Sequence, residues 1–157
     1  MTEGMELAGI ERELYIDAGP EIVFEVVSTP EHIVNWWTDE ANFDPNPGGS
    51  GWIGFGDVAA GGKRVEFSVA EAVPYRLFSF RWTHDAGEHA AAGNSNLVTF
   101  ELEPEGNGTR LRFTEVGFRE RGWDDAKAAN MHADHSNGWD YFLPRLVAYA
   151  AKLGAQA

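Results

Sequence analysis

The chain has 157 residues, with 12 Lys and Arg against 25 Asp and Glu, which gives a formal net charge of -13 at pH 7. This length fits one domain. The absence of cysteine from the sequence excludes disulfides, thiolate metal sites and a cysteine nucleophile. The acidic surplus repels phosphate backbones and anionic lipids, so we expect neither a nucleic acid nor a membrane as a partner.

The first residues do not have the pattern of a secretory signal sequence. Residues 1–6 are polar and acidic, whereas a secretory signal needs a basic start and then an apolar stretch. The sequence also has no run of about 18 apolar residues, the length that a membrane-spanning helix requires. We therefore expect a cytoplasmic protein.

The chain opens with a predicted strand and two short helices. Apolar and polar residues alternate over 7–17, the period of a strand with one buried face. A helix is predicted from Pro20, because proline suits the first helical turn. A second helix is predicted from Thr29-Pro30 and carries Trp36 and Trp37 on its last turn.

The middle of the chain predicts a sheet. Segment 38–51 is rich in Pro and Gly and is expected to be an irregular loop. Segment 83–95 lacks periodicity and is expected to be a mobile loop at the mouth of a cavity. The other predicted strands cover 52–57, 63–72, 75–82, 96–103 and 109–116. Alternate residues in four of them form an apolar face: Val65, Phe67, Val69, Phe78, Phe80, Trp82, Val98, Phe100, Leu102, Leu111 and Phe113.

The last third of the chain predicts one long helix over 124–153. Pro144 has no N–H for the carbonyl of Asp140, which predicts a kink there. Together the elements predict an α+β domain over 7–153, with an antiparallel sheet packed on this helix and with residues 1–6 and 154–157 as flexible termini. The apolar stripe of the helix is Ala128, His132, His135, Trp139, Leu143, Leu146, Ala150 and Leu153.

Several motifs occur in a characteristic order between about Ile10 and Leu153. They are Ile16-Asp17-Ala18-Gly19-Pro20, Thr29-Pro30-Glu31-His32-Ile33, Trp36-Trp37, Pro47-Gly48-Gly49, and Gly138-Trp139 followed by Leu143 and Leu146. This ordered set resembles the SRPBCC, or START-like, superfamily. Within it, the chain is most similar to the activator of heat-shock-protein-90 ATPase homologue family.

The resemblance implies a helix-grip fold similar to that of Bet v 1. In such a fold a curved antiparallel sheet wraps a long C-terminal helix and leaves a hollow that binds small apolar molecules. A binding protein of this kind requires no cofactor, and we expect none. The chain departs from the family pattern at Asn46, where members often have Arg before the Pro-Gly-Gly turn, and at Pro144 in the terminal helix.

Aromatic side chains on the inner faces are candidates for lining this hollow. They are Trp36, Trp37, Phe67, Phe80, Trp82, Phe100, Phe113 and Trp139. The alternative is that these rings simply fill a core. The indole nitrogens distinguish the two cases, because a buried Trp N–H needs a partner, and several such donors around a void would favour a ligand site.

Glu115 is the candidate polar anchor of the site. It lies two residues beyond Phe113, so a regular strand points its carboxyl inward. A buried carboxyl needs either a proton or a basic partner, and it could fix a ligand or act as a general acid and base. The alternative is a bulge or strand end that turns Glu115 toward solvent.

His132 and His135 lie one turn apart on the inner stripe of the predicted helix. We expect no metal, because a zinc site needs three or four ligands and no HExxH pattern occurs. A polar contact within the hollow and a purely structural histidine both remain open. The glycine pattern of residues 49–54 leads into a strand rather than a helix, so it does not predict a dinucleotide site.

Three functions fit these observations. The first is a binding protein for a hydrophobic or aromatic small molecule, which needs no enzyme activity. The second is a polyketide cyclase-like or hydrolase-like enzyme that uses Glu115 and a histidine. The third is a chaperone-associated interaction domain, whose mark would be an exposed apolar patch. We expect the first; the sequence identifies neither the ligand nor an oligomeric state.

Overall fold

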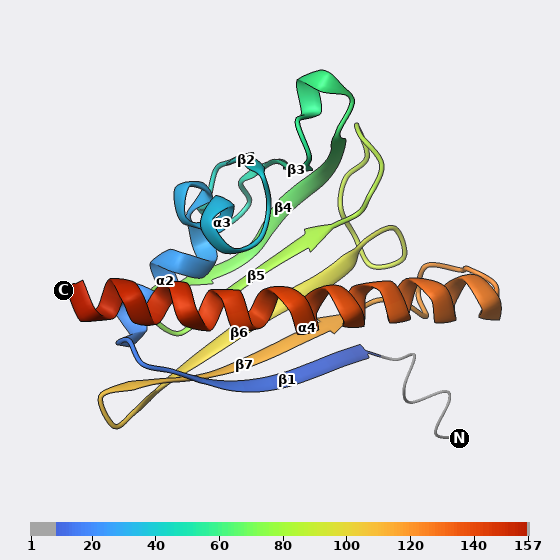
Figure 1. The fold of residues 1–157 in the computed structure, drawn as a ribbon. Helices are drawn as coiled ribbons and strands as arrows, with labels where there is room; N and C mark the ends of the chain where they lie inside the picture. Colours follow the sequence, from blue (N-terminus) through green and yellow to red (C-terminus); the bar gives the residue numbers. More distant parts are fainter. Residues whose placement is uncertain (1–8, 157) are drawn as a thin grey trace.

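The computed structural model describes residues 9–156 as one antiparallel sheet with helices on its concave side. The sheet has seven strands in the order β1-β7-β6-β5-β4-β3-β2. In Figure 1 the long helix α4 crosses the sheet, and α2 and α3 lie beside it. This confirms the predicted α+β helix-grip fold. The strands are β1 (Gly9–Ile16), β2 (Glu40–Phe43), β3 (Ser50–Phe55), β4 (Lys63–Val73), β5 (Leu77–Trp82), β6 (Asn96–Glu105) and β7 (Gly108–Val116). The helices are α2 (Pro20–Ser28), α3 (Pro30–Trp36), the 3-10 turn η1 (Val58–Ala60) and α4 (Asp125–Gln156).

The first strand pairs with the last one, so β1 forms one edge of the sheet. In β1 and β7, Ile10 lies opposite Glu115 and Ile16 lies opposite Thr109. The two helices begin at Pro20 and Pro30, as the sequence predicts, and Trp37 follows α3 as its C-cap residue. The predicted start of the strand at residue 7 lies outside the described residues.

Segment 38–51 is not the irregular loop that its composition predicts, because it contains strand β2. This strand pairs with β3, and Asn42 lies opposite Trp52. A Cβ on Gly51 would lie 2.0 Å from the backbone oxygen of Asn42, so glycine is required for this close approach. The ring of Phe43 also stacks on that of Phe67 at 4.2 Å. The four-residue strand β2 is thus stabilised by its pairing with β3, although the composition of the segment predicts a loop.

Helix α4 runs through Pro144 without interruption, and Figure 1 shows no sharp bend there, contrary to the predicted kink. Pro144 and Asp140 both lie on the exposed side of the helix. On that side water can bond to the carbonyl that lacks its helical donor, so the penalty of the proline is small. The opposite side, including Leu146 and Ala150, is buried. The helix also includes residues 154–156, which were expected to belong to a flexible terminus.

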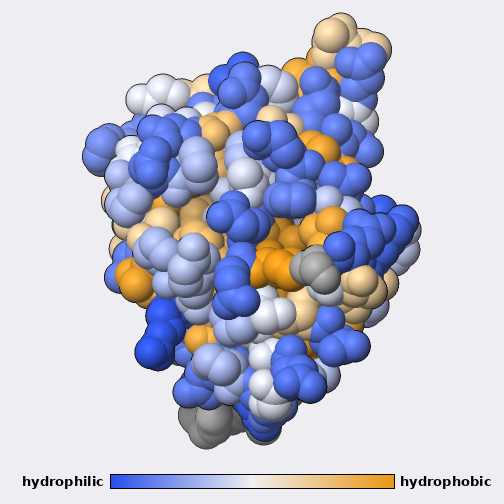
Figure 2. Space-filling view, turned by 90° about the vertical axis from the view of Figure 1, so that its left-hand side faces the viewer, coloured by the Kyte–Doolittle hydropathy of each residue, from blue (hydrophilic) through white to orange (hydrophobic). Residues whose placement is uncertain are grey.

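The apolar sheet face forms the core, as the sequence predicts. Phe67, Phe78, Phe80 and Phe113 have no exposed surface. By contrast, the face turned toward the viewer in Figure 2, where α4 ends, is mostly hydrophilic with a small apolar area near its centre. None of the described helices combines the length and the apolar composition that crossing a membrane requires.

Two Gly→Ala substitutions should shift stability in opposite directions. Gly51→Ala should lower the free energy of unfolding by about 1–3 kcal/mol or more, because the new methyl group collides with the backbone of β2. Gly138→Ala on α4 meets no atom within 4 Å and should raise it by about 1 kcal/mol through helix propensity. Urea unfolding of both variants measures the difference. A stable Gly51→Ala variant would show that β2 does not need this close approach.

Candidate functional site

A pocket of about 640 Å³ opens at one end of the molecule, between the sheet and the first half of α4. Strands β3 and β4 contribute Phe55 and Val65, and the loop after β5 contributes residues 83–86. Helix α4 contributes one wall through Met131, His135, Gly138, Trp139 and Phe142. Segment 83–95 therefore borders a pocket, as the sequence predicts. The absence of a side chain at Gly138 leaves space at the middle of the helical wall.

Three tryptophans from three elements form the inner wall of this pocket. Trp37 follows α3, Trp82 ends β5 and Trp139 lies on α4. The ring centroid of Trp37 lies 5.2 Å from that of Trp82 and 5.0 Å from that of Trp139, and those two are 5.9 Å apart. All three are at least 93 % buried, with 6 %, 7 % and 2 % exposure. Phe80 and Phe113 also pack against this cluster, so the three indoles are held in place by neighbouring rings.

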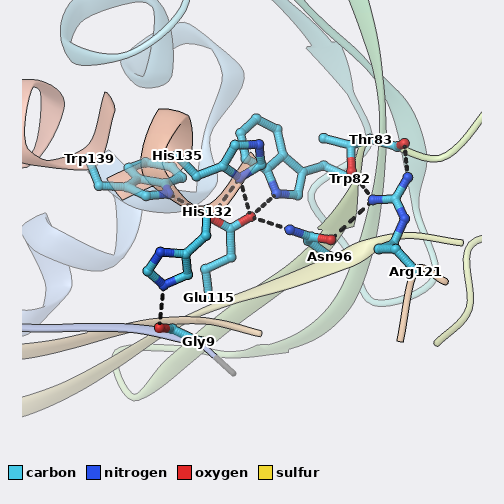
Figure 3. A network of polar contacts seen from close by, with 9 residues as sticks. All are labelled: Gly9, Trp82, Thr83, Asn96, Glu115, Arg121, His132, His135 and Trp139. Carbon is cyan, nitrogen blue, oxygen red and sulfur yellow. Dashed lines mark hydrogen bonds and ion pairs between the residues drawn. The ribbon is translucent and has the colours of Figure 1, made fainter. Parts of the chain in front are cut away.

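Glu115 lies behind this wall, with no exposed surface. Its carboxyl accepts hydrogen bonds from Trp82 Nε1 at 2.8 Å, Trp139 Nε1 at 2.9 Å and Asn96 Nδ2 at 3.1 Å. His135 Nδ1 completes the set at 2.9 Å from Oε2. Figure 3 shows these four side chains directed at the Glu115 carboxyl. Regular pairing of β7 with β6, where Val98 lies opposite Glu115, turns the group inward as predicted.

This contact also determines which nitrogen of His135 carries the proton. A carboxylate accepts hydrogen bonds, so Nδ1 is the donor and carries a proton. Nε2 of His135 has no hydrogen-bond partner within residues 9–156, and the side chain, 12 % exposed, lines the pocket. The pair therefore presents one ring nitrogen to the pocket while holding the other.

The polar network continues from Glu115 to Arg121 through the Asn96 side chain. Asn96 Oδ1 accepts from Arg121 Nη1 at 3.1 Å, while its amide nitrogen donates to Glu115. Arg121 also donates to Thr83 Oγ1 at 2.7 Å and to Thr83 O at 3.0 Å. Its guanidinium lies over the ring of Trp123 at 4.5 Å. Removal from water lowers the pKa of Arg121 below its ordinary value, against the opposing charges of Asp85, Glu115 and Glu88.

Two further features mark the loop that follows β5. Thr83 has a φ of 67°, a backbone conformation that is strained for a β-branched residue. His84 lines the pocket, and its buried Nδ1 has no hydrogen-bond partner in the described chain. Burial is the main cause that lowers the pKa of His84; the nearby charge of Glu66 raises it and that of Arg121 lowers it further.

Of the aromatic and histidine residues predicted for the site, only four line the pocket: Trp37, Trp82, His135 and Trp139. The other rings pack into the core and do not reach it: Trp36, Phe67, Phe80, Phe100 and Phe113. The rings of Phe67 and Phe80 stack at 4.2 Å, and the indole N–H of Trp36 donates to the carbonyl of Val26. The middle of the interior is thus filled, and the hollow lies at one end of it.

His132 lies away from the pocket. Its Nε2 is 2.9 Å from the carbonyl oxygen of Gly9 in β1, and its ring meets the edge of Phe118. It joins the first strand to α4, which is a structural role. Within residues 9–156, no three His, Asp or Glu side chains converge as they would around a metal ion.

The sequence reasoning missed the polar side chains at the far end of the network. Asn96 carried a usable signal, because it lies two residues before Val98 and so on the same inward face of β6. Arg121, Thr83 and Trp123 carried none. They lie in irregular segments between elements, where no period predicts the direction of a side chain.

Comparison with known structures shows the same fold in several proteins. MLL2253 from Mesorhizobium loti is 22% identical, with coverage of 92% of this chain and 97% of that chain and a TM-score of 0.71. The Aha1 dimer from Colwellia psychrerythraea is 23% identical, with 88% and 92% coverage and a TM-score of 0.64. DynU16, a protein in the dynemicin biosynthetic locus, is 22% identical, with 90% and 46% coverage and a TM-score of 0.65.

No curated protein is significantly similar to the sequence. A family model does match, and it spans residues 17–151, from the end of β1 to the last turns of α4. This match confirms the resemblance carried by the ordered motifs. The chain belongs to the family described as Activator of Hsp90 ATPase homolog 1-like protein.

Proposed function

We propose that the chain binds a small hydrophobic or aromatic molecule in the pocket beside α4. A volume of about 640 Å³ falls within the range of about 300–1,000 Å³ that is typical of small-molecule sites. The lining joins aromatic carbon to a few polar groups, which is the usual division between affinity and orientation.

The observation that carries the proposal is the aromatic wall of the pocket, which is formed by Trp37, Trp82 and Trp139. Trp82 and Trp139 both donate to Glu115, behind the wall. These two N–H donors are bonded to Glu115 rather than left open around the void, so the indole nitrogens do not themselves favour a ligand. The support comes from the ring faces, which line the pocket with apolar carbon. Because Trp82 and Trp139 are already fixed by Glu115 and packed against Trp37, the wall costs little to organise when an aromatic molecule binds.

Binding of the neutral fluorescent probe N-phenyl-1-naphthylamine tests this proposal. The wild type and Gly138→Ala should bind it with similar affinity, whereas Gly138→Phe should bind at least about tenfold more weakly, because the new ring occupies the pocket without removing any existing contact. Fluorescence titration gives the dissociation constants, and thermal melts show that both variants are folded. No binding by the wild type, or equal binding by Gly138→Phe, would refute the proposal.

A catalytic role of the same pocket is the second candidate, and the Glu115–His135 pair is the observation that favours it. His135 Nε2 could accept a proton from water as the water oxygen bonds to the carbonyl carbon of an ester. The ester C–O bond then breaks, and the proton passes from Nε2 to the departing alcohol. Glu115 would act as a positioning residue through Nδ1.

Hydrolysis of 1-naphthyl acetate tests this second candidate. An enzyme should show saturable turnover that falls about a hundredfold or more in His135→Gln, while that variant still binds N-phenyl-1-naphthylamine. Glu115→Gln should lower kcat and alter the pH profile without abolishing turnover. Wild-type hydrolysis no faster than that of Gly138→Phe would reject the enzyme and leave the binding protein.

A chaperone-associated role calls for a contiguous apolar surface. The large hydrophobic side chains that are exposed within residues 9–156 are spread over β1, α3, the β4–β5 hairpin, β7 and α4: Tyr15, Val34, Val73, Tyr75, Val116 and Tyr141. Nothing in this distribution favours a protein-binding face over the pocket.

A further inference from the structure

Arg121 stands out among the pocket residues because it is a partly buried cation with only neutral hydrogen-bond partners. Its three bonds go to Thr83 Oγ1, Thr83 O and Asn96 Oδ1. No carboxylate oxygen of residues 9–156 lies within 4.0 Å of it. Arg64, in the same pocket, meets the carboxylate of Glu66 instead, although it is more exposed to water.

The guanidinium of Arg121 also keeps unused donors. It has five N–H groups, of which two on Nη1 and one on Nη2 are bonded. The remaining Nε–H and Nη2–H are the pair by which a guanidinium meets a carboxylate side-on. Arg110 uses these same two nitrogens toward Glu105, at 3.1 and 2.6 Å. Arg121 therefore offers a carboxylate-binding edge that the described chain does not fill.

The charge of the surroundings permits an anion here. The chain as a whole carries -13, but the pocket wall is balanced: Lys63, Arg64 and Arg121 face Glu66, Asp85 and Asp134. Glu115 is fully buried behind the indoles, and its oxygens accept four donors. Asp85, Glu88 and Glu115 lie near enough to act on the charge of Arg121, but none of them forms an ion pair with it, so an incoming carboxylate displaces no existing partner.

We infer that Arg121 receives the carboxylate of an aromatic acid whose rings lie against the tryptophans of the pocket. The inference rests on the binding function proposed above and adds the chemical class of the ligand. Asn96 ties the two halves of the site together, because it bonds both to Arg121 and to the carboxyl that holds Trp82 and Trp139. An acid group on Arg121 and a ring against the indoles can then belong to one molecule.

Matched ligands test the inference: 9-anthracenecarboxylate and its neutral analogue 9-anthracenecarboxamide, titrated by fluorescence. The wild type should prefer the acid by about tenfold or more, as expected for a charge-assisted bond pair. Arg121→Gln should lose this preference while its affinity for the amide stays within about twofold. Arg110→Gln is the control, since Arg110 lies outside the pocket and its corresponding edge is already filled by Glu105; it should keep the preference.

Arg121→Lys is a second variant that separates loss of binding from loss of folding. It keeps the positive charge but lacks the planar guanidinium edge, so it should retain only part of the preference for the acid. Equal wild-type affinity for acid and amide would overturn the inference while leaving the proposed function intact. An equal loss of both ligands in Arg121→Gln would also overturn it, and would assign Arg121 to holding the loop at Thr83. If neither ligand binds the wild type, the inference fails, and the neutral probe N-phenyl-1-naphthylamine shows whether the pocket proposal fails with it.

Discussion

A carboxyl group with no access to water imposes the strictest condition on this structure. Burying Glu115 without partners would cost several kcal/mol, so every lone pair has to meet a donor. The donors come from β5, β6 and α4 in the form of Trp82, Asn96, and His135 with Trp139. The sheet and the helix can therefore close only in the arrangement that brings these side chains together. The shape of the pocket follows, because two of its three indoles are held by the same bonds.

The remainder of the interior shows how a curved sheet can be filled. Phe67, Phe80 and Phe43 form a continuous stack, and Trp37 spans from this stack to α4. Rings occupy the middle of the concave face completely, since close packing leaves few voids in a protein interior. The helix carries Gly138 where the stack ends, and the hollow begins there. Its position thus reflects where side-chain volume runs out, not the curvature of the sheet alone.

The sequence contained enough to predict the fold and part of the site. The alternation that predicts an inward Phe113 extends to Glu115, because β7 stays regular to Val116. The same rule applied two residues before Val98 would have found Asn96. The sequence could not separate the five rings that fill the core from Trp37, Trp82 and Trp139, which line the pocket. Periodicity shows which face of a strand or helix a residue lies on, but not how far that face lies from the element packed against it. Arg121 follows the last strand in an irregular segment, and its place depends on tertiary contacts that have no local pattern.

The strained backbone at Thr83 links the rim of the pocket to its interior. A β-branched residue at a φ of 67° stores about 1–3 kcal/mol, and the same residue is bonded through both its carbonyl and its hydroxyl to Arg121. An interaction that stabilises the guanidinium in this position also stabilises the strained backbone conformation of Thr83. By thermodynamic reciprocity, an interaction that stabilises this backbone conformation also stabilises the guanidinium. The position of the Arg121 guanidinium and the conformation of the Thr83 backbone are therefore coupled. A carboxylate bound to Arg121, as inferred above, would therefore also stabilise the strained backbone at the rim of the pocket.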